Sequence, residues 1–167
     1  MKKVAFAVVG VRNFAQNHIR NIQAVEEEGI GELRAVVVRD QERYSGNLQN
    51  FLAELQSQGV VIYSSYEELL EKGKGIIDII TLPVAMHTHY ELAKQGMEAG
   101  YNLVLEKPPV PTVQQLDELM AVEKQTGTFC SIGFQMIHSR SLRRLKQEIL
   151  AGKLGKIKEI LRLKTCI

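Results

Sequence analysis

The first residues whose types and spacing could do chemistry stand in the stretch VAFAVVGVRNFAQNHIRNI near the N-terminus. An apolar strand, a turn and a helix bind the pyrophosphate of a dinucleotide when the turn reads Gly-x-Gly-x-x-Gly, because small residues let the phosphates approach the helix N–H groups. Here the three positions are Gly10, Arg12 and Ala15. Two interpretations stay open. The turn is either a phosphate site altered at Arg12, with Asn13 and Phe14 beside it, or an ordinary turn that needs one glycine.

The end of the second apolar run, AVVVRDQER, offers a second test of nucleotide binding. A carboxylate at this point would accept hydrogen bonds from the adenosine ribose of NAD. Val38 stands at that position, and Arg39 and Asp40 follow it. An arginine beside a missing acid accommodates a 2′-phosphate, so the pattern favours NADP over NAD as the cofactor. Asp40 could equally be a turn residue.

His87 and His89 form an H-x-H pair, which raises the question of a metal site. On a helix this spacing points the two side chains to different faces, and no cysteine or carboxylate cluster completes a ligand set. We therefore expect no metal.

These residues must be positioned by short apolar runs rich in Val and Ile that alternate with segments of helical period. This alternation is typical of βαβ units around a parallel sheet, whose central strands are covered on both faces. The sequence thus predicts an α/β fold, a Rossmann-type doubly wound and mostly parallel sheet. The predicted strands are 3–9, 33–38, 59–63, 76–82, 101–106 and 129–134, and the predicted helices are 14–28, 47–57, 87–99, 113–126 and 139–151.

Local signals agree with the predicted helices. Ser65 with Glu68, and Thr112 with Gln115, have the spacing of capping boxes, in which each side chain satisfies the backbone N–H of the other residue. Glycines follow the helical segments where a left-handed ending is expected, at Gly73, Gly100, Gly127 and Gly152.

Composition narrows the class of protein. The chain has 167 residues, 45% of them hydrophobic, and a net charge of +2, which suits one globular core with a possible appendage and excludes a disordered chain. A basic bias after Arg140 is typical of a solvated helix face, so no nucleic-acid partner is expected. No apolar run approaches the roughly 20 residues that cross a bilayer, so no membrane partner is expected either. The absence of a CxxC pair or a leader segment indicates a reduced, cytoplasmic protein.

Longer motifs in this order resemble the glucose-fructose oxidoreductase and inositol dehydrogenase family, Gfo/Idh/MocA. They are the first turn with His18 on the following helix, then DQER, SSYEELL, IITLPVAMH, AGYNLVLEKPPVPTVQQLDELM and GFQMIHSRSLRRLKQEILAGKLGKIKEI. The resemblance implies an NAD(P)-binding Rossmann domain over residues 1–133. Residues 134–167 would be the first helix and strand of an incomplete second α/β domain, which in the family supplies most of the substrate pocket and an acid–base aspartate and histidine.

The resemblance also assigns site residues. Lys107 matches a family lysine near the nicotinamide and substrate, where it stabilises charge or assists proton transfer, so it is the candidate catalytic residue. Glu106 and Pro108 match residues that shape the same turn, and His87 matches a histidine near the cofactor. His18 matches a position on the first helix, where a packed structural histidine and a contact residue are both open.

Three positions depart from the family pattern. After the fourth strand the family has a small polar residue, proline and asparagine, whereas this chain keeps Pro83 between Leu82 and Val84. Arg12 and Val38 are the other two departures. Each departure removes a group or space expected for the dinucleotide, so together they would weaken its binding.

Two functions follow as hypotheses. The first is an NAD(P)-dependent oxidoreductase, or its cofactor-binding part, that transfers a hydride between nicotinamide and a hydroxyl or carbonyl carbon of a sugar, polyol or related small molecule. The second is a non-catalytic Rossmann module that binds a nucleotide or a protein. An alternating apolar pattern over 156–164 predicts a C-terminal strand, through which we expect a homo-oligomer to form.

Overall fold

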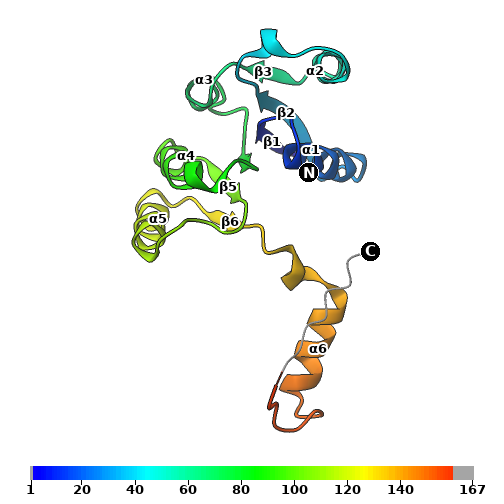
Figure 1. Ribbon diagram of the computed structural model, residues 1–167, viewed down its shortest axis with the longest axis vertical. Coiled ribbons are helices and arrows are strands. Elements are labelled where there is room, and N and C mark those ends of the chain that lie inside the picture. The colour runs from blue at the N-terminus through cyan, green and yellow to red at the C-terminus, as the bar shows by residue number, and fades with distance from the viewer. Residues whose placement is uncertain (1, 160–167) are drawn as a thin grey trace. The chain divides into compact units, whose positions relative to one another are not determined.

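The computed structural model describes residues 2–159, and its core is a six-stranded parallel sheet in the order β3-β2-β1-β4-β5-β6 (Figure 1). This strand order is that of the doubly wound dinucleotide-binding fold, so the predicted fold class is confirmed. The strands are β1 (Val4–Val9), β2 (Gly31–Val37), β3 (Val61–Tyr63), β4 (Ile79–Leu82), β5 (Asn102–Leu105) and β6 (Cys130–Ile132).

Helices connect the strands, and each expected helix is found within about one residue of its predicted ends. The bounds are α1 (Phe14–Glu27), α2 (Asn47–Ser57), α3 (Tyr66–Lys72), α4 (Met86–Glu98), α5 (Val113–Thr126) and α6 (Arg140–Leu150), with short 3-10 helices η1 (Gln41–Arg43) and η2 (Gln135–His138). The strand predicted over 76–82 begins only at Ile79. Asp78 precedes it, and the carboxylate of Asp78 accepts the backbone N–H of Ala5 at 2.8 Å.

Two hydrophobic cores cover the two faces of the sheet. On one face α1 and α2 pack against β1 and β2, and Figure 1 shows α4 and α5 on the opposite side. Ile19 and Leu52 belong to the first core, and Leu69, Met97 and Leu103 to the second, all almost without exposure. Each such side chain contributes about 1.5–3 kcal/mol by leaving water. Burial on both faces is why the strands read as continuous apolar runs.

In each predicted capping box, only the hydrogen bond that the Ser or Thr side chain accepts is formed as expected. Ser65 accepts the N–H of Glu68 at 3.1 Å, but the Glu68 carboxylate returns to the N–H of Ser64 at 2.8 Å rather than to Ser65. Hydrogen bonds from Lys72 and Ser64 lower the pKa of Glu68 to about 2. Thr112 likewise accepts the N–H of Gln115 at 3.3 Å.

The predicted left-handed glycines are confirmed at three positions and wrong at one. Gly100, Gly127 and Gly152 have φ of +90°, +70° and +70°. Gly73 has φ −81°, because the chain continues through a further turn in which Ile77 donates its N–H to the Gly73 carbonyl at 2.9 Å. The left-handed residue there is Gly75, with φ +76°.

A second compact unit begins at Phe134, after the first unit ends at Gly133. It contains η2 and α6, whose leucines are largely exposed. The strand predicted over 156–164 is not formed by residues 156–159, and its remainder lies outside the described residues. Oligomer formation through this segment therefore stays a prediction. Within residues 2–159, no helix has the length and apolar character needed to span a membrane.

The packing of α4 against β5 predicts the effect of Gly96→Ala. Alanine in a helix interior normally stabilises by about 1 kcal/mol relative to glycine. A methyl group on Gly96 would collide with the Tyr66 hydroxyl and lie 3.0 Å from Cδ2 of Leu103. We expect the free energy of unfolding in urea to fall by about 1–3 kcal/mol. In a Tyr66→Phe background the same substitution should cost less, and a stabilised Gly96→Ala protein would contradict this packing.

Candidate functional site

A cleft of about 550 Å³ opens at the carboxyl ends of β1, β2 and β4. Because β1 lies between β2 and β4, the connections leave the sheet in opposite directions at this point, and ligands of doubly wound sheets bind there. The lining comes from the β1–α1 turn, the end of β2, the start of α3 and the β4–α4 connection. The lining residues include Gly10, Arg12, Ala15, Arg39, Tyr44, Ser65, Tyr66, Glu67, Pro83, Val84, Ala85, His87 and Thr88.

The turn after β1 has the geometry of an anion site. Gly10 has φ +101°, which favours glycine, and its N–H donates to the Val37 carbonyl at 2.9 Å, so the turn is tied to β2. Asn13 precedes α1, and among the described residues its side chain makes no capping hydrogen bond. The N–H groups of Ala15 and Gln16 already donate to the carbonyl oxygens of Arg12 and Asn13, at 3.0 and 3.2 Å. What the start of α1 offers an anion in the cleft is therefore mainly the positive end of the helix dipole.

Arg12 is directed to the end of β2 rather than across the turn. Its guanidinium carbon lies 5.9 Å from the centre of the Tyr44 ring, within range of a cation–π interaction. Tyr44 and Arg39 also line the cleft. Two guanidinium groups thus belong to the region where the sequence lacks the ribose-binding carboxylate.

The residues after β2 take different roles. Val38, the position expected to carry that carboxylate, is buried in the core on the α1 side, and its N–H donates to the Tyr63 carbonyl at 2.8 Å. Asp40 adopts φ +51° and forms an ion pair with Arg43 at 3.5 Å. Asp40 therefore acts as the turn residue that was one of its two expected roles.

The start of α3 also borders the cleft, although its sequence carries no motif that predicts a site residue. Tyr66 is buried and donates its hydroxyl to the Leu92 carbonyl at 3.0 Å. Burial, with a smaller effect of Tyr101, raises the pKa of the Tyr66 hydroxyl far above its ordinary value, so this group stays a donor. The position of α3 after β3 could have pointed to it, since carboxyl ends of parallel strands share one edge.

The two histidines of the H-x-H pair lie on different faces of α4, as expected. His87 is exposed and lines the cleft, whereas His89 is 1% exposed. In His89, Nδ1 lies 3.0 Å from the Pro108 carbonyl oxygen and Nε2 lies 3.1 Å from that of Val84. His89 thus joins the β4–α4 connection to the segment after β5. Within the described residues, no group of three or more His, Cys, Asp or Glu side chains could hold a metal ion.

The EKP segment after β5 is held from α1. His18 Nε2 lies 3.0 Å from Glu106 Oε1, and both side chains are mostly buried. Of the two expectations for His18, the structure shows a packed residue that contacts Glu106. Lys107 is exposed, and its peptide bond to Pro108 is cis.

The predicted site residues divide into two groups. Those that line the cleft are Gly10, Arg12, Ala15, Arg39, Pro83 and His87. Those that do not line it are Asn13, Phe14, Val38, Leu82, Glu106, Lys107 and Pro108. Within the second group, Leu82 and Val38 are core residues, buried between the sheet and the helices that cover it.

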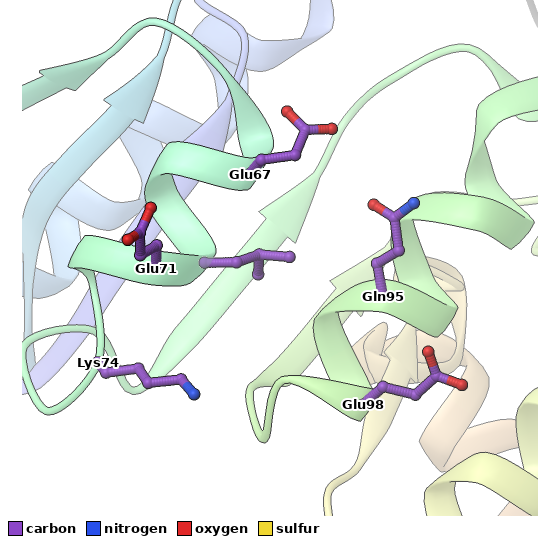
Figure 2. Close-up of a pocket in the computed structure, with 6 residues that line it drawn as sticks. Glu67, Glu71, Lys74, Gln95 and Glu98 are labelled. Atoms are coloured by element: carbon purple, nitrogen blue, oxygen red, sulfur yellow. The ribbon is translucent and has the colours of Figure 1, made fainter.

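A second hollow, of about 640 Å³, lies between α3 and α4 (Figure 2). Figure 2 shows Glu67 and Glu71 on α3 and Glu98 on α4 around it, with Lys74 at one end. Three carboxylates against one ammonium disfavour an anionic ligand such as a dinucleotide. The cleft at the carboxyl edge is therefore the better candidate site.

The buried position of His89 predicts a difference between two substitutions on one helix. His89→Leu should lower the free energy of unfolding by about 1–3 kcal/mol, because the carbonyl oxygens around the ring lose their N–H partner. His87→Leu should change it by less than about 0.5 kcal/mol, since His87 is exposed. Urea unfolding followed by circular dichroism measures both. Equal effects would show that the contacts of His89 contribute nothing particular to stability.

Comparison with known proteins gives a family match over most of the chain. Residues 4–134 match the Gfo/Idh/MocA family, described as an oxidoreductase family with an NAD-binding Rossmann fold. The uncharacterized oxidoreductase YhhX of Escherichia coli is 35% identical over 85 residues, 50% of this chain and 25% of that protein. The dTDP-3,4-didehydro-2,6-dideoxy-alpha-D-glucose 3-reductase of Actinomadura kijaniata is 24% identical over 155 residues, 93% of this chain and 43% of that protein.

A solved structure shows the same fold. Scyllo-inositol dehydrogenase from Lactobacillus casei, with bound NAD(H) and scyllo-inositol, superposes with a TM-score of 0.75 at 19% identity. The superposition covers 92% of this chain and 43% of that one. The chain therefore spans less than half the length of the relatives that it matches.

Proposed function

Because this chain belongs to the Gfo/Idh/MocA oxidoreductase family, with its NAD-binding Rossmann fold over residues 4–134, we propose that it is the cofactor-binding part of a dehydrogenase or reductase. The reaction would transfer a hydride between a nicotinamide dinucleotide and a hydroxyl or carbonyl carbon of a sugar, polyol or related small molecule. The observation that carries this proposal is the cleft at the carboxyl edge, bordered by Gly10 and the start of α1.

The residues of the cleft fit a dinucleotide. Gly10 supplies the left-handed turn, and the start of α1, where the Asn13 side chain makes no capping hydrogen bond, supplies the positive end of the helix dipole. These groups would hold the pyrophosphate. When bound, the nicotinamide would supply the hydride chemistry, and the protein would bind, orient and shield it from water. Ala15 still lets α1 pack close to β1, since alanine is only one methyl group larger than the expected glycine.

Lys107 is the residue proposed to act nearest the reacting atoms. It follows β5 at the same carboxyl edge of the sheet as the cleft. An ammonium there would stabilise negative charge on the substrate oxygen or move a proton at that oxygen. The names of two relatives support the substrate class, since one reduces a dTDP-linked sugar and another binds scyllo-inositol.

Titration with NADH and NADPH tests the proposal. We expect saturable binding by calorimetry with a blue shift of nicotinamide fluorescence. Gly10→Ala should weaken binding at least tenfold, because alanine is strained at φ +101° and the phosphate turn must move. Gly127→Ala is the matched control, since Gly127 also has positive φ but lies at the end of α5, and it should leave affinity unchanged. Absence of binding up to millimolar cofactor would refute the proposal and favour a non-catalytic module.

The finer proposal is a preference for NADP(H). Its support is the pair of guanidinium groups, Arg12 over Tyr44 and Arg39, in the part of the cleft at the end of β2. Each could donate charge-assisted hydrogen bonds to a 2′-phosphate, and Val38 leaves no carboxylate to repel it.

Arg12→Gly therefore distinguishes the two roles of this side chain. We expect NADPH affinity to fall about 10-fold to 100-fold, as for loss of a charged hydrogen-bond donor, with a smaller change for NADH. Tyr44→Leu should weaken NADPH binding about twofold to fivefold by removing the ring that supports the guanidinium. Arg20→Gln, on the exposed side of α1, controls for net charge. If Arg12→Gly instead strengthened binding of both cofactors, the side chain would be an obstruction.

A further inference from the structure

We infer that His18 and Glu106 are a positioning pair that couples the start of α1 to Lys107. This role rests on the cofactor-binding function proposed above. The two residues are separated by 88 positions in the sequence, yet His18 Nε2 and Glu106 Oε1 lie 3.0 Å apart. Their side chains are only 14% and 15% exposed, so the contact is shielded from competing water.

The carboxylate of Glu106 makes two contacts with different partners. An ionised carboxylate only accepts hydrogen bonds, so His18 must donate from Nε2 to Oε1. The other oxygen, Oε2, accepts the backbone N–H of Lys107 at 3.3 Å. One side chain thus connects α1 with the backbone from which the Lys107 side chain extends.

Gly133, directly after β6, leaves room for the carboxylate on another side. A Cβ atom on Gly133 would lie 3.0 Å from Glu106 Oε1, so a side chain at this position would displace the carboxylate. The N–H of Gly133 donates to the Leu105 carbonyl at 2.8 Å, which fixes the glycine beside β5. The absence of a side chain at Gly133 therefore leaves the space that the Glu106 carboxylate occupies while it holds Lys107.

His18 is also connected to the phosphate-binding turn. Phe14, the first residue of α1, places its ring edge-on to the His18 ring with centroids 5.5 Å apart. The first turn of α1 is where the pyrophosphate would bind. A displacement there would pass through His18 to Glu106 and the Lys107 backbone. The pair thus sets the spacing between the phosphate half of the site and the lysine.

The inference has a readout in the protein without cofactor. In His18→Leu, the amide hydrogen of Lys107 should exchange about threefold to tenfold faster by NMR, because the carboxylate that accepts its hydrogen bond is released. His18→Gln, which keeps a donor amide, should restore most of the protection. Lys72→Gln removes an exposed ion pair of 2.9 Å with Glu68 on α3 and serves as the matched control. Unchanged Lys107 exchange in His18→Leu would overturn the inference, whether or not the chain binds a dinucleotide.

A second readout separates positioning from general stability. Glu106→Gln keeps the size of the side chain but leaves one acceptor oxygen for two donors. We expect it to weaken NADH binding severalfold and leave ADP-ribose binding within about twofold, since ADP-ribose lacks the nicotinamide near Lys107. In a Lys107→Ala background, Glu106→Gln should have little further effect on NADH affinity.

The outcomes are distinguishable. Equal loss of NADH and ADP-ribose binding in Glu106→Gln, or full additivity with Lys107→Ala, would mean that the pair only stabilises the fold. Failure of the unmodified chain to bind either ligand would refute the proposed function, and the exchange of the Lys107 amide would still decide on the pair.

Discussion

The placement of β1 between β2 and β4 is the constraint on which the rest of the structure depends. β1 pairs in parallel with both neighbours, so the chain must leave its carboxyl end toward one face and later return on the other. That reversal opens the cleft and brings α1 to its border. It also divides the hydrophobic core into two, which makes β1 buried on both sides. A polar residue within this strand would disturb the core that its side chain faces, since Ala7 and Val9 belong to one core and Val8 to the other.

The charge of the cleft depends on the end of β2, where an apolar residue stands in place of a carboxylate. Where a ribose-binding carboxylate would face the ligand, Val38 instead extends the core between the sheet and α1. Arg12 and Arg39 then contribute positive charge, and Tyr44 supports the first of them through its ring. Arg12, which replaces the second glycine of the pattern, is therefore accommodated because its side chain extends to Tyr44. The departures from the family pattern at Arg12 and Val38 are therefore parts of one arrangement.

One partly buried histidine, His18, and one fully buried histidine, His89, hold the segment that carries the proposed catalytic lysine. His18 reaches it from α1 through Glu106, and His89 reaches it from α4 through the backbone carbonyl of Pro108. Both use an imidazole nitrogen as a hydrogen-bond donor in a place with little water. Neither contact involves a charged group on the surface, so salt screens them less than it screens exposed pairs. The lysine thus extends from a backbone that is held from two sides of the sheet.

The sequence by itself determined the kind and order of the elements, because that information is local. Continuous apolar runs mark strands covered on both faces, and Ser65 and Thr112 mark helix starts through bonds to residues three positions on. Even there it failed at Gly73, where the next turn decided the conformation. The tertiary structure alone decided which side chains meet. The cation–π contact of Arg12 with Tyr44 and the bond between His18 and Glu106 join residues far apart in the chain, and only the strand order brings them together.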